Sequence, residues 1–330
     1  MQMREVRHSS ISLYLGMLAI LASVSGASAQ QPYPAKPVRV IVPYPAGGVV
    51  ELFARAVTDE ISRRWSQPFI IEPHPGASAS IGTLAALNHE PDGHTWLIGG
   101  ASLIANPLLF KSARWDPVRD FAGVGVAGST PMVFVVTDKL PAKSLGDAID
   151  LAKAAPGRLA AATMFGSSSH FNLEMLKQAA SVQFLTVPYK GAPPIVADLV
   201  NGSVQVSMLP LAVALPHAQS GRIRALAVAA WTRSPLYPNV PTFAEAGFAQ
   251  AAFVSTYIFV VPRATPAAVV ARINAGINEA LKSPATRTCV LALGSEVAMP
   301  MSPAEIDAMI KVDYDRYAAL IRRAGIRIED

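Results

Sequence analysis

The stretch from Val38 to Trp65 constrains the fold more than any other part of the chain. It begins with strand-forming residues 38–42, continues through the loop Pro43-Tyr44-Pro45-Ala46-Gly47-Gly48, and then places apolar residues at helical spacing. The glycine pair before the helix is expected to leave unpaired backbone N–H groups at the positive end of the helix dipole. Such a position suits a carboxylate or another small anion.

Strand-like and helix-like segments alternate along the rest of the chain and are separated by short turns rich in Pro and Gly. This alternation predicts an α/β fold with a mainly parallel sheet in each domain. Charged residues make up only 15% of the chain, which suits sheets covered by helices on both faces. Strands are expected near residues 70–72, 95–99, 132–136, 160–163, 184–187, 204–208 and 225–229, and helices near 80–88, 144–155, 171–180, 194–201, 266–282 and 303–323.

The first 29 residues have the pattern of a secretory signal peptide. Arg4 and Arg7 supply a positive start, residues 13–24 form an apolar core, and Ala27-Ser28-Ala29 is a small-x-small cleavage site. A membrane anchor would need about 18 apolar residues, and this run is shorter. We therefore expect cleavage after Ala29 and a mature protein outside the cytoplasm.

The mature chain of about 300 residues exceeds what one hydrophobic core usually supports, so two domains are expected. The small, Pro-containing stretch Val126–Pro131 is a natural crossing point, and the strand-like stretch Phe253–Val261 is a natural return. The prediction is a discontinuous lobe 1 of residues 30–130 and 253–330 and a lobe 2 of residues 131–252. A cleft between two such lobes is a natural ligand site.

A second loop suited to an anion is Gly166-Ser167-Ser168-Ser169-His170, which we call the serine loop. It lies between the expected strand 160–163 and the next helix. Its serines can cap the helix, or their hydroxyl and backbone N–H groups can face a ligand. Paired with the Gly47-Gly48 loop across a cleft, ligand binding becomes the better interpretation. Tyr189 and the turn Asn106-Pro107 after Ser102 are further candidates for the wall, and both also fit ordinary turns.

Charge and cysteine content argue against several functions. The net charge of +5 is modest and the Lys and Arg residues are scattered, so no nucleic-acid partner is expected. The single cysteine, Cys289, excludes an internal disulfide and a cysteine-cluster metal site, and we expect it to be a buried thiol. No H-E-x-x-H pattern is present, so no metal and no cofactor are predicted.

The enzyme motifs are weak. Residues 123–128 match G-x-G-x-x-G, but they lack the preceding strand and following helix of a dinucleotide site. The serine loop lacks G-x-S-x-G, and His170 beside it is better explained as a residue of the first helical turn. We therefore expect no catalytic residues, and a serine hydrolase acting through Ser168 or Ser169 with His170 is kept only as an unfavoured alternative.

Taken in order, many short motifs resemble one family, the periplasmic solute-binding proteins of tripartite tricarboxylate transporters (the Bug or TctC type). The resemblance covers essentially residues 32–328, and each motif is weak by itself. The motifs are Tyr33-Pro34-Ala35-Lys36-Pro37, Pro45-Ala46-Gly47-Gly48, Pro91-Asp92-Gly93-His94, Asn106-Pro107, Trp115-Asp116-Pro117-Val118-Arg119-Asp120-Phe121, Ser168-Ser169-His170, Val187-Pro188-Tyr189-Lys190-Gly191, Leu215-Pro216-His217, Arg224-Ala225-Leu226-Ala227-Val228, Val240-Pro241-Thr242 and Glu245-Ala246-Gly247.

The resemblance implies a two-lobed Venus-flytrap protein, a monomer by expectation, that closes on a small organic carboxylate and presents it to membrane permease subunits. It implies a periplasmic location. A ligand-sensing module that serves a signalling partner remains the alternative from another class. The ligand-binding residues implied by position are Tyr44, Ala46, Gly47, Gly48 and Val50 in one lobe, Phe165, Gly166, Ser167, Ser168 and Ser169 in the other, and Ser102, Asn106 and Tyr189 in the walls.

Departures from the family pattern bear on the ligand. Where the family usually has small polar residues followed by Asp, this chain has Val49-Val50-Glu51, and where the family tends to have Gly or small polar residues it has Met164-Phe165. Leu209-Pro210 stands where a polar or acidic residue is often seen, and Thr256 stands where Trp is often seen. Together these departures exchange polar pocket groups for apolar ones. An apolar wall leaves a second carboxylate or an ammonium group unpaired, at a cost of several kcal/mol. The sequence therefore predicts a ligand with one carboxylate and an apolar or aromatic body, provided that these side chains face the cleft.

Overall fold

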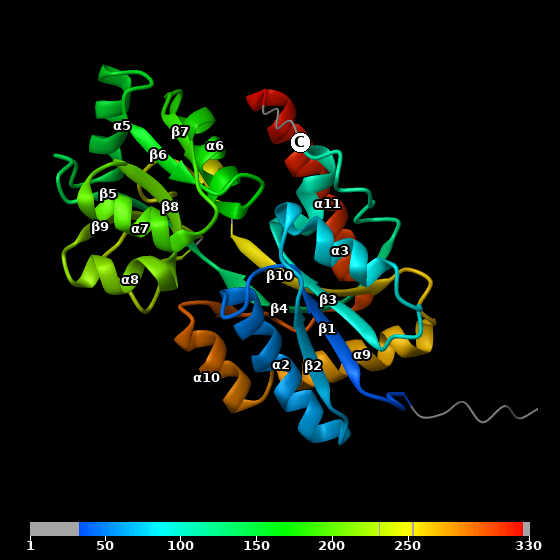
Figure 1. Ribbon diagram of the computed structural model, residues 1–330. Coiled ribbons are helices and arrows are strands. Elements are labelled where there is room, and N and C mark those ends of the chain that lie inside the picture. The colour runs from blue at the N-terminus through cyan, green and yellow to red at the C-terminus, as the bar shows by residue number, and fades with distance from the viewer. Residues whose placement is uncertain (1–32, 231, 253, 326–330) are drawn as a thin grey trace, which may run out of the picture. The chain divides into compact units, whose positions relative to one another are not determined.

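The computed structural model describes residues 33–230, 232–252 and 254–325, so the expected signal peptide lies outside the described residues. From Lys36 onward the chain forms one compact unit. This unit contains two separate β-sheets, each covered by helices, and we call them lobe 1 and lobe 2 (Figure 1). In the described ranges, no helix combines the length and apolar character needed to cross a membrane.

Lobe 1 is built on a six-stranded sheet. Its spatial order is β11 (Glu296–Val297), β4 (Phe121–Thr130), β10 (Ser255–Pro262), β3 (Thr95–Gly99), β1 (Val38–Val42) and β2 (Phe69–Pro73). The strand β1 pairs in parallel with both β2 and β3, whereas β10 runs antiparallel to β3 and β4. The strand predicted at the start of the chain therefore lies inside the sheet, with four of its five residues buried.

Helices cover both faces of this sheet (Figure 1). On one face α2 (Val49–Trp65) packs against both α9 (Ala267–Ala280) and α10 (Pro284–Ala292). The helices of the other face are α3 (Ser80–Leu87), α4 (Ala101–Ala105) and α11 (Pro303–Ala324). The short 3-10 turns η1 (Ala77–Ala79) and η2 (Asn106–Leu108) precede α3 and follow α4, and η3 (Ala249–Ala251) precedes β10.

Lobe 2 has a five-stranded sheet in the order β7 (Leu185–Pro188), β6 (Ala160–Thr163), β8 (Val206–Pro210), β5 (Met132–Thr137) and β9 (Ile223–Ala229). Successive side chains of β5 point to opposite faces, as strand geometry requires. Met132, Phe134 and Val136 join the core under α5 (Leu145–Ala154) and α6 (Ser168–Ala180). Val133 and Val135 join the core under α7 (Ala192–Asn201) and α8 (Leu211–Gln219).

Both sheets are mixed, so the expectation of mainly parallel sheets needs correction. In lobe 2, β6 runs parallel to β7 and β8, but β5 runs antiparallel to β8 and β9. In lobe 1 the antiparallel pairing follows from the path of the chain. Strand β4 leads out of lobe 1 and β10 leads back into it, so these two neighbours run in opposite directions. The exact lobe boundaries, at residues 130/131 and 252/253, stay a prediction.

The G-x-G-x-x-G sequence of residues 123–128 lies inside strand β4. A phosphate-binding loop needs these glycines at the turn between a strand and a helix. Close packing accounts for two of them. A Cβ at Gly123 would lie 2.3 Å from Ile306 of α11, and one at Gly125 would lie 2.5 Å from Ile277 of α9.

Cys289 is exposed, contrary to the expectation of a buried thiol. It belongs to α10, whose buried residues include Thr286 and Val290. Thr286 and Val290 are four residues apart and share the inner face of the helix, and Cys289 lies at the edge of that face, where its side chain is exposed. The apolar residues that follow Cys289 in sequence were therefore no guide to its burial.

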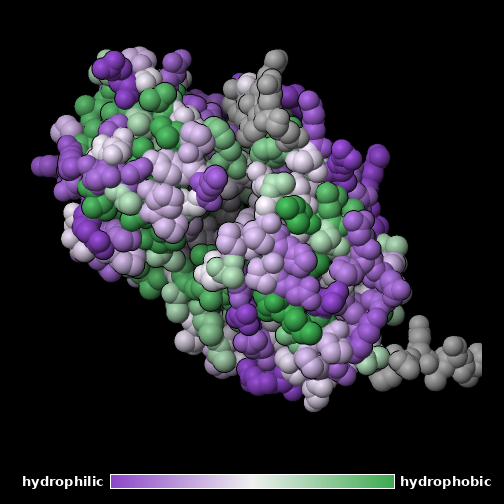
Figure 2. All heavy atoms as spheres, in the orientation of Figure 1, coloured by the Kyte–Doolittle hydropathy of each residue, from purple (hydrophilic) through white to green (hydrophobic). Residues whose placement is uncertain are grey.

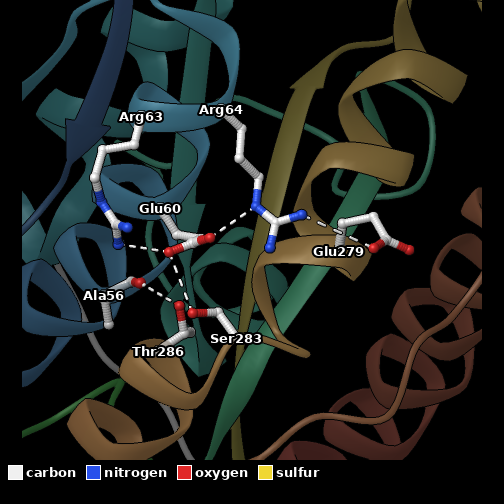
Figure 3. A network of polar contacts seen from close by, with 7 residues as sticks. All are labelled: Ala56, Glu60, Arg63, Arg64, Glu279, Ser283 and Thr286. Carbon is white, nitrogen blue, oxygen red and sulfur yellow. Dashed lines mark hydrogen bonds and ion pairs between the residues drawn. The ribbon is translucent and has the colours of Figure 1, made fainter.

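A buried glutamate of α2 forms hydrogen bonds that hold this helix against the start of α10 (Figure 3). Glu60 is only 6% exposed, and its carboxylate accepts hydrogen bonds from Arg64 at 2.7 Å and from Ser283 at 3.2 Å. Arg63 lies 2.5 Å from the same carboxylate, and the hydroxyl of Thr286 donates to the carbonyl of Ala56 at 2.9 Å. These contacts hold α2 against α10 and so fix the direction in which the N-terminus of α2 points.

Helix α6 belongs to lobe 2 but contributes a residue to the core of lobe 1. Phe171 is fully buried, and its ring centroid lies 4.5 Å from that of Tyr317 of α11. The same core cluster contains Ile41 of β1 and Leu103 of α4. The first turn of α6 is therefore held at the junction of the two lobes.

Candidate functional site

Two adjoining cavities form a cleft between the lobes, where the space-filling view is hollowed (Figure 2). The smaller one, about 160 Å³, we call the inner compartment. The larger one, about 780 Å³, we call the outer compartment. Both are lined by Tyr44, Ser102, Met164 and Ser167, so they form one continuous site.

Walls of the inner compartment come from both lobes and are mostly apolar. Its polar groups are concentrated in the serine loop at the start of α6. The lining residues are Tyr44, Val50, Gly100, Ala101, Ser102, Met132, Met164, Ser167, Ser168, Ser169, Pro210 and Tyr257.

The outer compartment adds proline and aromatic side chains and the loop that precedes α3. Its lining residues are Pro43, Tyr44, Pro45, Pro75, Gly76, Ala77, Ser78, Ala79, Ser102, Asn106, Met164, Phe165, Gly166, Ser167, Pro188, Tyr189 and Lys190.

Two hydroxyl groups of the serine loop donate to backbone carbonyls of lobe 2. Ser167 donates to the carbonyl of Met164 at 2.6 Å, and Ser169 donates to the carbonyl of Met208 at 2.6 Å. Ser167 is the N-cap of α6 but makes no side-chain cap, and the first turn carries no acidic residue. By helix geometry the first backbone N–H groups of α6 have no partner within the helix. This end of α6 can therefore bind an anion through its backbone and its dipole.

The start of α2 carries its own carboxylate. The N–H of Gly47 donates to Glu51 Oε2 at 2.8 Å, and Nε of Arg55 donates to Oε1 at 2.8 Å. Glu51 is 7% exposed, and the hydrogen bond from Gly47, followed by that from Arg55, holds its pKa below the usual value although burial opposes this. The expectation that Gly47 offers an unpaired N–H is therefore wrong, because a glutamate in the first turn reaches back to it.

The two loops predicted to bind an anion are therefore not equivalent in the structure. Tyr44 and Val50 line the cleft, but Ala46, Gly47 and Gly48 line neither compartment. A direct contact between those three residues and a ligand stays a prediction.

Tyr44 and Ser102 meet at the boundary of the two compartments. The Tyr44 hydroxyl lies 2.6 Å from Ser102 Oγ. Burial raises the pKa of Tyr44, while the hydrogen bond with Ser102 acts in the opposite direction. The pair is therefore an uncharged polar group at neutral pH, able to exchange hydrogen bonds with a ligand.

Glycine is required where lobe 2 approaches Asn106. Gly166 has a φ of +71°, and a Cβ on it would lie 2.8 Å from Asn106 Oδ1 and 2.9 Å from the ring of Phe110. Any larger residue would push the serine loop away from lobe 1. Phe165, which precedes it, is 38% exposed and lines the outer compartment.

Tyr189 lines the outer compartment, and the proton of its hydroxyl is already used. It donates to Asp198 of α7 at 2.5 Å. Burial, together with this hydrogen bond to a carboxylate, raises the pKa of Tyr189 to about 12. The neighbouring Lys190 is exposed and lines the same compartment.

His170 does not have the environment of a general base. Burial, with a smaller contribution from Lys177, lowers its pKa to about 4. Its Nδ1 accepts from the N–H of Gly166 at 3.5 Å, and its ring packs 4.8 Å from that of Phe165. The hydroxyls of Ser167 and Ser169 donate to backbone carbonyls instead of to His170. Within the described ranges, no group of three or more His, Cys, Asp or Glu side chains could hold a metal ion.

Several lining residues were missed by sequence reasoning. Met132 and Tyr257 come from β5 and β10, the strands next to the two crossings between lobes. Pro210 also lines the inner compartment, although the family pattern indicated it only as a departure. On β10 it is Tyr257, and not its neighbour Thr256, that lines this compartment. The loop 75–79 follows β2, and its Pro75-Gly76 turn was the only signal in the sequence.

Comparisons with known proteins agree with this architecture. The family model described as the tripartite tricarboxylate transporter family receptor matches residues 53–326. BugT of Bordetella pertussis is 31% identical over 320 residues, which cover 96% of this chain and 97% of that protein.

Other relatives have solved structures. MatC from Rhodopseudomonas palustris, solved with bound malate, is 28% identical with a TM-score of 0.79, covering 88% of this chain and 100% of that chain. An R. palustris protein solved with adipate is 30% identical with a TM-score of 0.81, covering 89% of this chain and 99% of that chain.

Fold and cleft therefore define a two-lobed periplasmic solute-binding protein, and the predicted fold class is confirmed. Within that class, this chain belongs to the tripartite tricarboxylate transporter receptor family, as its motifs indicated.

Proposed function

We propose that the protein binds a small organic carboxylate in the cleft and delivers it to the membrane permease subunits of a tripartite transporter, without chemical turnover. The observation that carries the proposal is the lining of the inner compartment. It combines the first turn of α6, which contains no acidic residue, with mostly apolar walls. The ligand carboxylate would lie at Ser167–Ser169, where backbone N–H groups and the helix dipole favour negative charge. The malate and adipate in the two R. palustris relatives support a carboxylate ligand.

The body of the ligand would be apolar or aromatic. Three positions that depart from the family pattern, Val50, Met164 and Pro210, all line the inner compartment. Leu209, by contrast, is fully buried and lines neither compartment, and neither does Thr256. A second carboxylate in the inner compartment would lose its hydration without gaining a partner. We therefore infer a monocarboxylate, in contrast to the dicarboxylates of the two relatives.

Thermal unfolding of the mature chain, from Gln30 onward, against a panel of acids tests the proposal. The panel contains aromatic and aliphatic monocarboxylates, their uncharged amides, dicarboxylates, tricarboxylates and amino acids. A ligand present at about 100 times its dissociation constant stabilises the fold by about 2.7 kcal/mol, which shifts the midpoint by several degrees. Shifts restricted to monocarboxylates support the proposal, and shifts with polar diacids alone contradict the ligand class. No shift with any acid contradicts the function itself.

A variant pair tests where the carboxylate lies. Ser168→Asp places a like charge in the first turn of α6 and is expected to weaken binding at least about tenfold. Ala267→Asp is the matched control, because Ala267 is the exposed first residue of α9, away from the cleft. An acidic residue in a first turn favours either helix, so both variants should fold. Equal affinities for the two variants would remove α6 from the binding site.

Secretion and delivery rest on the family relationship. Cleavage after Ala29 is tested by determining the N-terminus of protein recovered from the periplasm. Delivery is tested by uptake of the bound acid in cells that contain or lack the permease subunits. Uptake that does not depend on the permease would favour the sensing alternative. Sedimentation of the mature chain tests the proposed monomer.

A further inference from the structure

A cavity separate from the cleft lies where α6 of lobe 2 faces α11 of lobe 1, and we call it the junction cavity. It measures about 390 Å³, and small-molecule sites have volumes of about 300–1,000 Å³. It shares no lining residue with the inner or the outer compartment. Its polar lining residues are Gln178, Gln250, Arg316 and Arg323, and the remainder are Met175, Ala179 and Leu320.

Both lobes contribute a wall to the junction cavity. Met175, Gln178 and Ala179 follow the i, i+3, i+4 spacing of one helix face on α6. Arg316, Leu320 and Arg323 follow the i, i+4, i+7 spacing of one face on α11. The turn η3, which carries Gln250, belongs with lobe 2, because its Ala251 is buried in the core of that lobe.

Positive charge dominates the junction cavity. Two arginines line it, and none of the described lining residues is acidic. Nη2 of Arg316 donates to the carbonyl of Ala252 at 3.1 Å, which holds this guanidinium beside η3. Asp313 lies one turn earlier on α11 but does not line the cavity, and burial raises the pKa of its carboxyl while Arg316 opposes the rise. Arg323 belongs to none of the ion pairs among the described residues.

This lining suits an anion with oxygen acceptors. A guanidinium group matches the geometry of carboxylate and phosphate oxygens and can donate two parallel hydrogen bonds. The amide of Gln178 donates to the carbonyl of Leu320 only at 3.5 Å, the long limit of a hydrogen bond, so it can turn to a better acceptor. Arg323 and Gln250 are exposed, which leaves the cavity open to solvent.

Two arginines favour a ligand with more than one negative charge. Arg316 and Arg323 are seven residues apart, so their Cα atoms are separated by about 10 Å along the axis of α11. A single small carboxylate contacts one of the two guanidinium groups, whereas an anion with two acidic groups can contact both. The apolar residues Met175, Ala179 and Leu320 can pack against the carbon atoms of such a ligand.

We propose that the junction cavity is a second ligand site, which binds a small polyvalent anion between the arginines of α11 and the glutamine amides of lobe 2. The acidic groups can be carboxylates or phosphates, since both offer the oxygens that guanidinium groups bind. The bound anion joins α6 to α11 and so links the two lobes. The inference does not depend on the proposed function, because it uses another cavity and another class of anion.

Calorimetry on the mature chain tests the proposal with two probes, pyrophosphate and citrate, in about 0.15 M salt to screen weak surface attraction. We expect one equivalent of at least one probe to bind, and the tighter probe identifies the acidic group. Arg323→Gln should weaken this binding about tenfold. Arg322→Gln is the matched control, because it removes the same charge from the exposed neighbour that does not line the cavity. Its effect should be less than about twofold. Absence of binding by both probes, or equal losses in the two variants, overturns the inference.

A second pair of variants tests the wall from lobe 2. Gln178→Glu introduces a negative charge that competes for the arginines, so the probe should bind at least about tenfold more weakly. Gln183→Glu makes the same change at an exposed residue after α6 that does not line the cavity, and its effect should be below about twofold. Equal effects of the two variants contradict a site that both lobes form.

The cleft variant Ser168→Asp distinguishes the two sites. It should weaken the binding of monocarboxylates in the cleft but change that of the polyvalent probe by less than about twofold. A probe that is lost in Ser168→Asp and retained in Arg323→Gln binds in the cleft, and the inference is then overturned. If no monocarboxylate binds but the probe still depends on Arg323, the proposed function fails and the junction site stands.

Discussion

Individual residues make the two helix starts at the cleft chemically different. At α2, Glu51 satisfies the N–H of Gly47 and is itself held by Arg55. At α6 the corresponding first turn contains no acid, and Ser167 directs its hydroxyl back to Met164. The glutamate of α2 therefore occupies a backbone N–H before its own helix in lobe 1, whereas the start of α6 in lobe 2 is where we propose that the ligand carboxylate binds.

Replacing Glu51 should loosen the loop before α2. Glu51→Ala leaves the Gly47 N–H without its acceptor and is expected to destabilise the fold by about 1–2 kcal/mol. Glu51→Gln keeps an acceptor and loses only the pairing with the half-exposed Arg55, so its cost should be below about 1 kcal/mol. Urea unfolding at pH 7 measures both variants. Equal losses would show that the ion pair, rather than the bond to Gly47, holds the loop.

The two variants should also differ from wild type in acid. Because the folded pKa of Glu51 lies below its ordinary value of 4.5, its contribution is present above that pH and disappears as pH falls through the folded pKa. Wild type should therefore lose more stability than Glu51→Gln between about pH 5 and pH 3. Parallel pH curves would contradict the lowered pKa.

His170 should weaken the protein in mild acid. Its folded pKa of about 4 lies below the ordinary 6.5, so between these values the unfolded chain binds the extra proton. Stability should fall as pH drops from 6.5 to 4, by up to about 3 kcal/mol from this residue. His170→Gln keeps an acceptor for the Gly166 N–H but cannot take up a proton. Urea unfolding at pH 7, 5.5 and 4.5 should show a smaller fall for this variant, and an equal fall would contradict the assignment.

At the scale of elements, helices are positioned by their ends and by a few buried polar contacts. Ser144, at the start of the helix expected near residues 144–155, caps α5 in a capping box with Asp147. Helix α6 begins at Ser168, three residues earlier than expected, so its serines form the first turn instead of a preceding loop. Helix α2 is oriented by the Glu60 contacts to α10 (Figure 3).

Removing the Glu60 carboxylate should separate α2 from α10. Glu60→Ala leaves the hydroxyl of Ser283 without this acceptor and removes the partner of both arginines, at an expected cost of about 2 kcal/mol. Glu279→Ala is the control, because its pairing with Arg64 spans 3.9 Å and both side chains are about half exposed. Its loss should be barely measurable, because the contacts of Glu279 with Arg64 and Lys282 are exposed ion pairs. Chemical unfolding of both variants measures the two losses of stability. Equal losses would contradict the larger contribution assigned to the buried Glu60 carboxylate.

For the whole molecule, the chain path and one aromatic contact join the lobes. Strands β4 and β10 connect the two sheets, and Phe171 of α6 is buried in the core of lobe 1 beside Tyr317. Phe171 lies two residues after Ser169, so the contact that joins the lobes and the proposed carboxylate site share one helical turn.

Truncating Phe171 should therefore affect both stability and lobe closure. Phe171→Ala is expected to cost about 3–4 kcal/mol and to enlarge the radius of gyration of the unliganded protein in X-ray scattering. Phe134→Ala, within lobe 2 alone, is the matched control, since Phe134 is equally buried but packs inside its own sheet. It should cost a similar amount without a change in size. The same radius for both variants would mean that Phe171 does not hold the lobes together.

The sequence by itself determined the α/β class and most strands and helices, because these depend on periodicity, turn residues and short motifs that are local in the chain. It did not reveal that Glu51 occupies the Gly47 N–H, that Cys289 is exposed, or that Tyr257 faces the cavity. Side-chain direction at each of these positions depends on helix phase or strand register, and a shift of one residue reverses it. The pairing of Asn106 with Ser78 likewise joins segments 28 residues apart, and only packing of the folded chain brings them together.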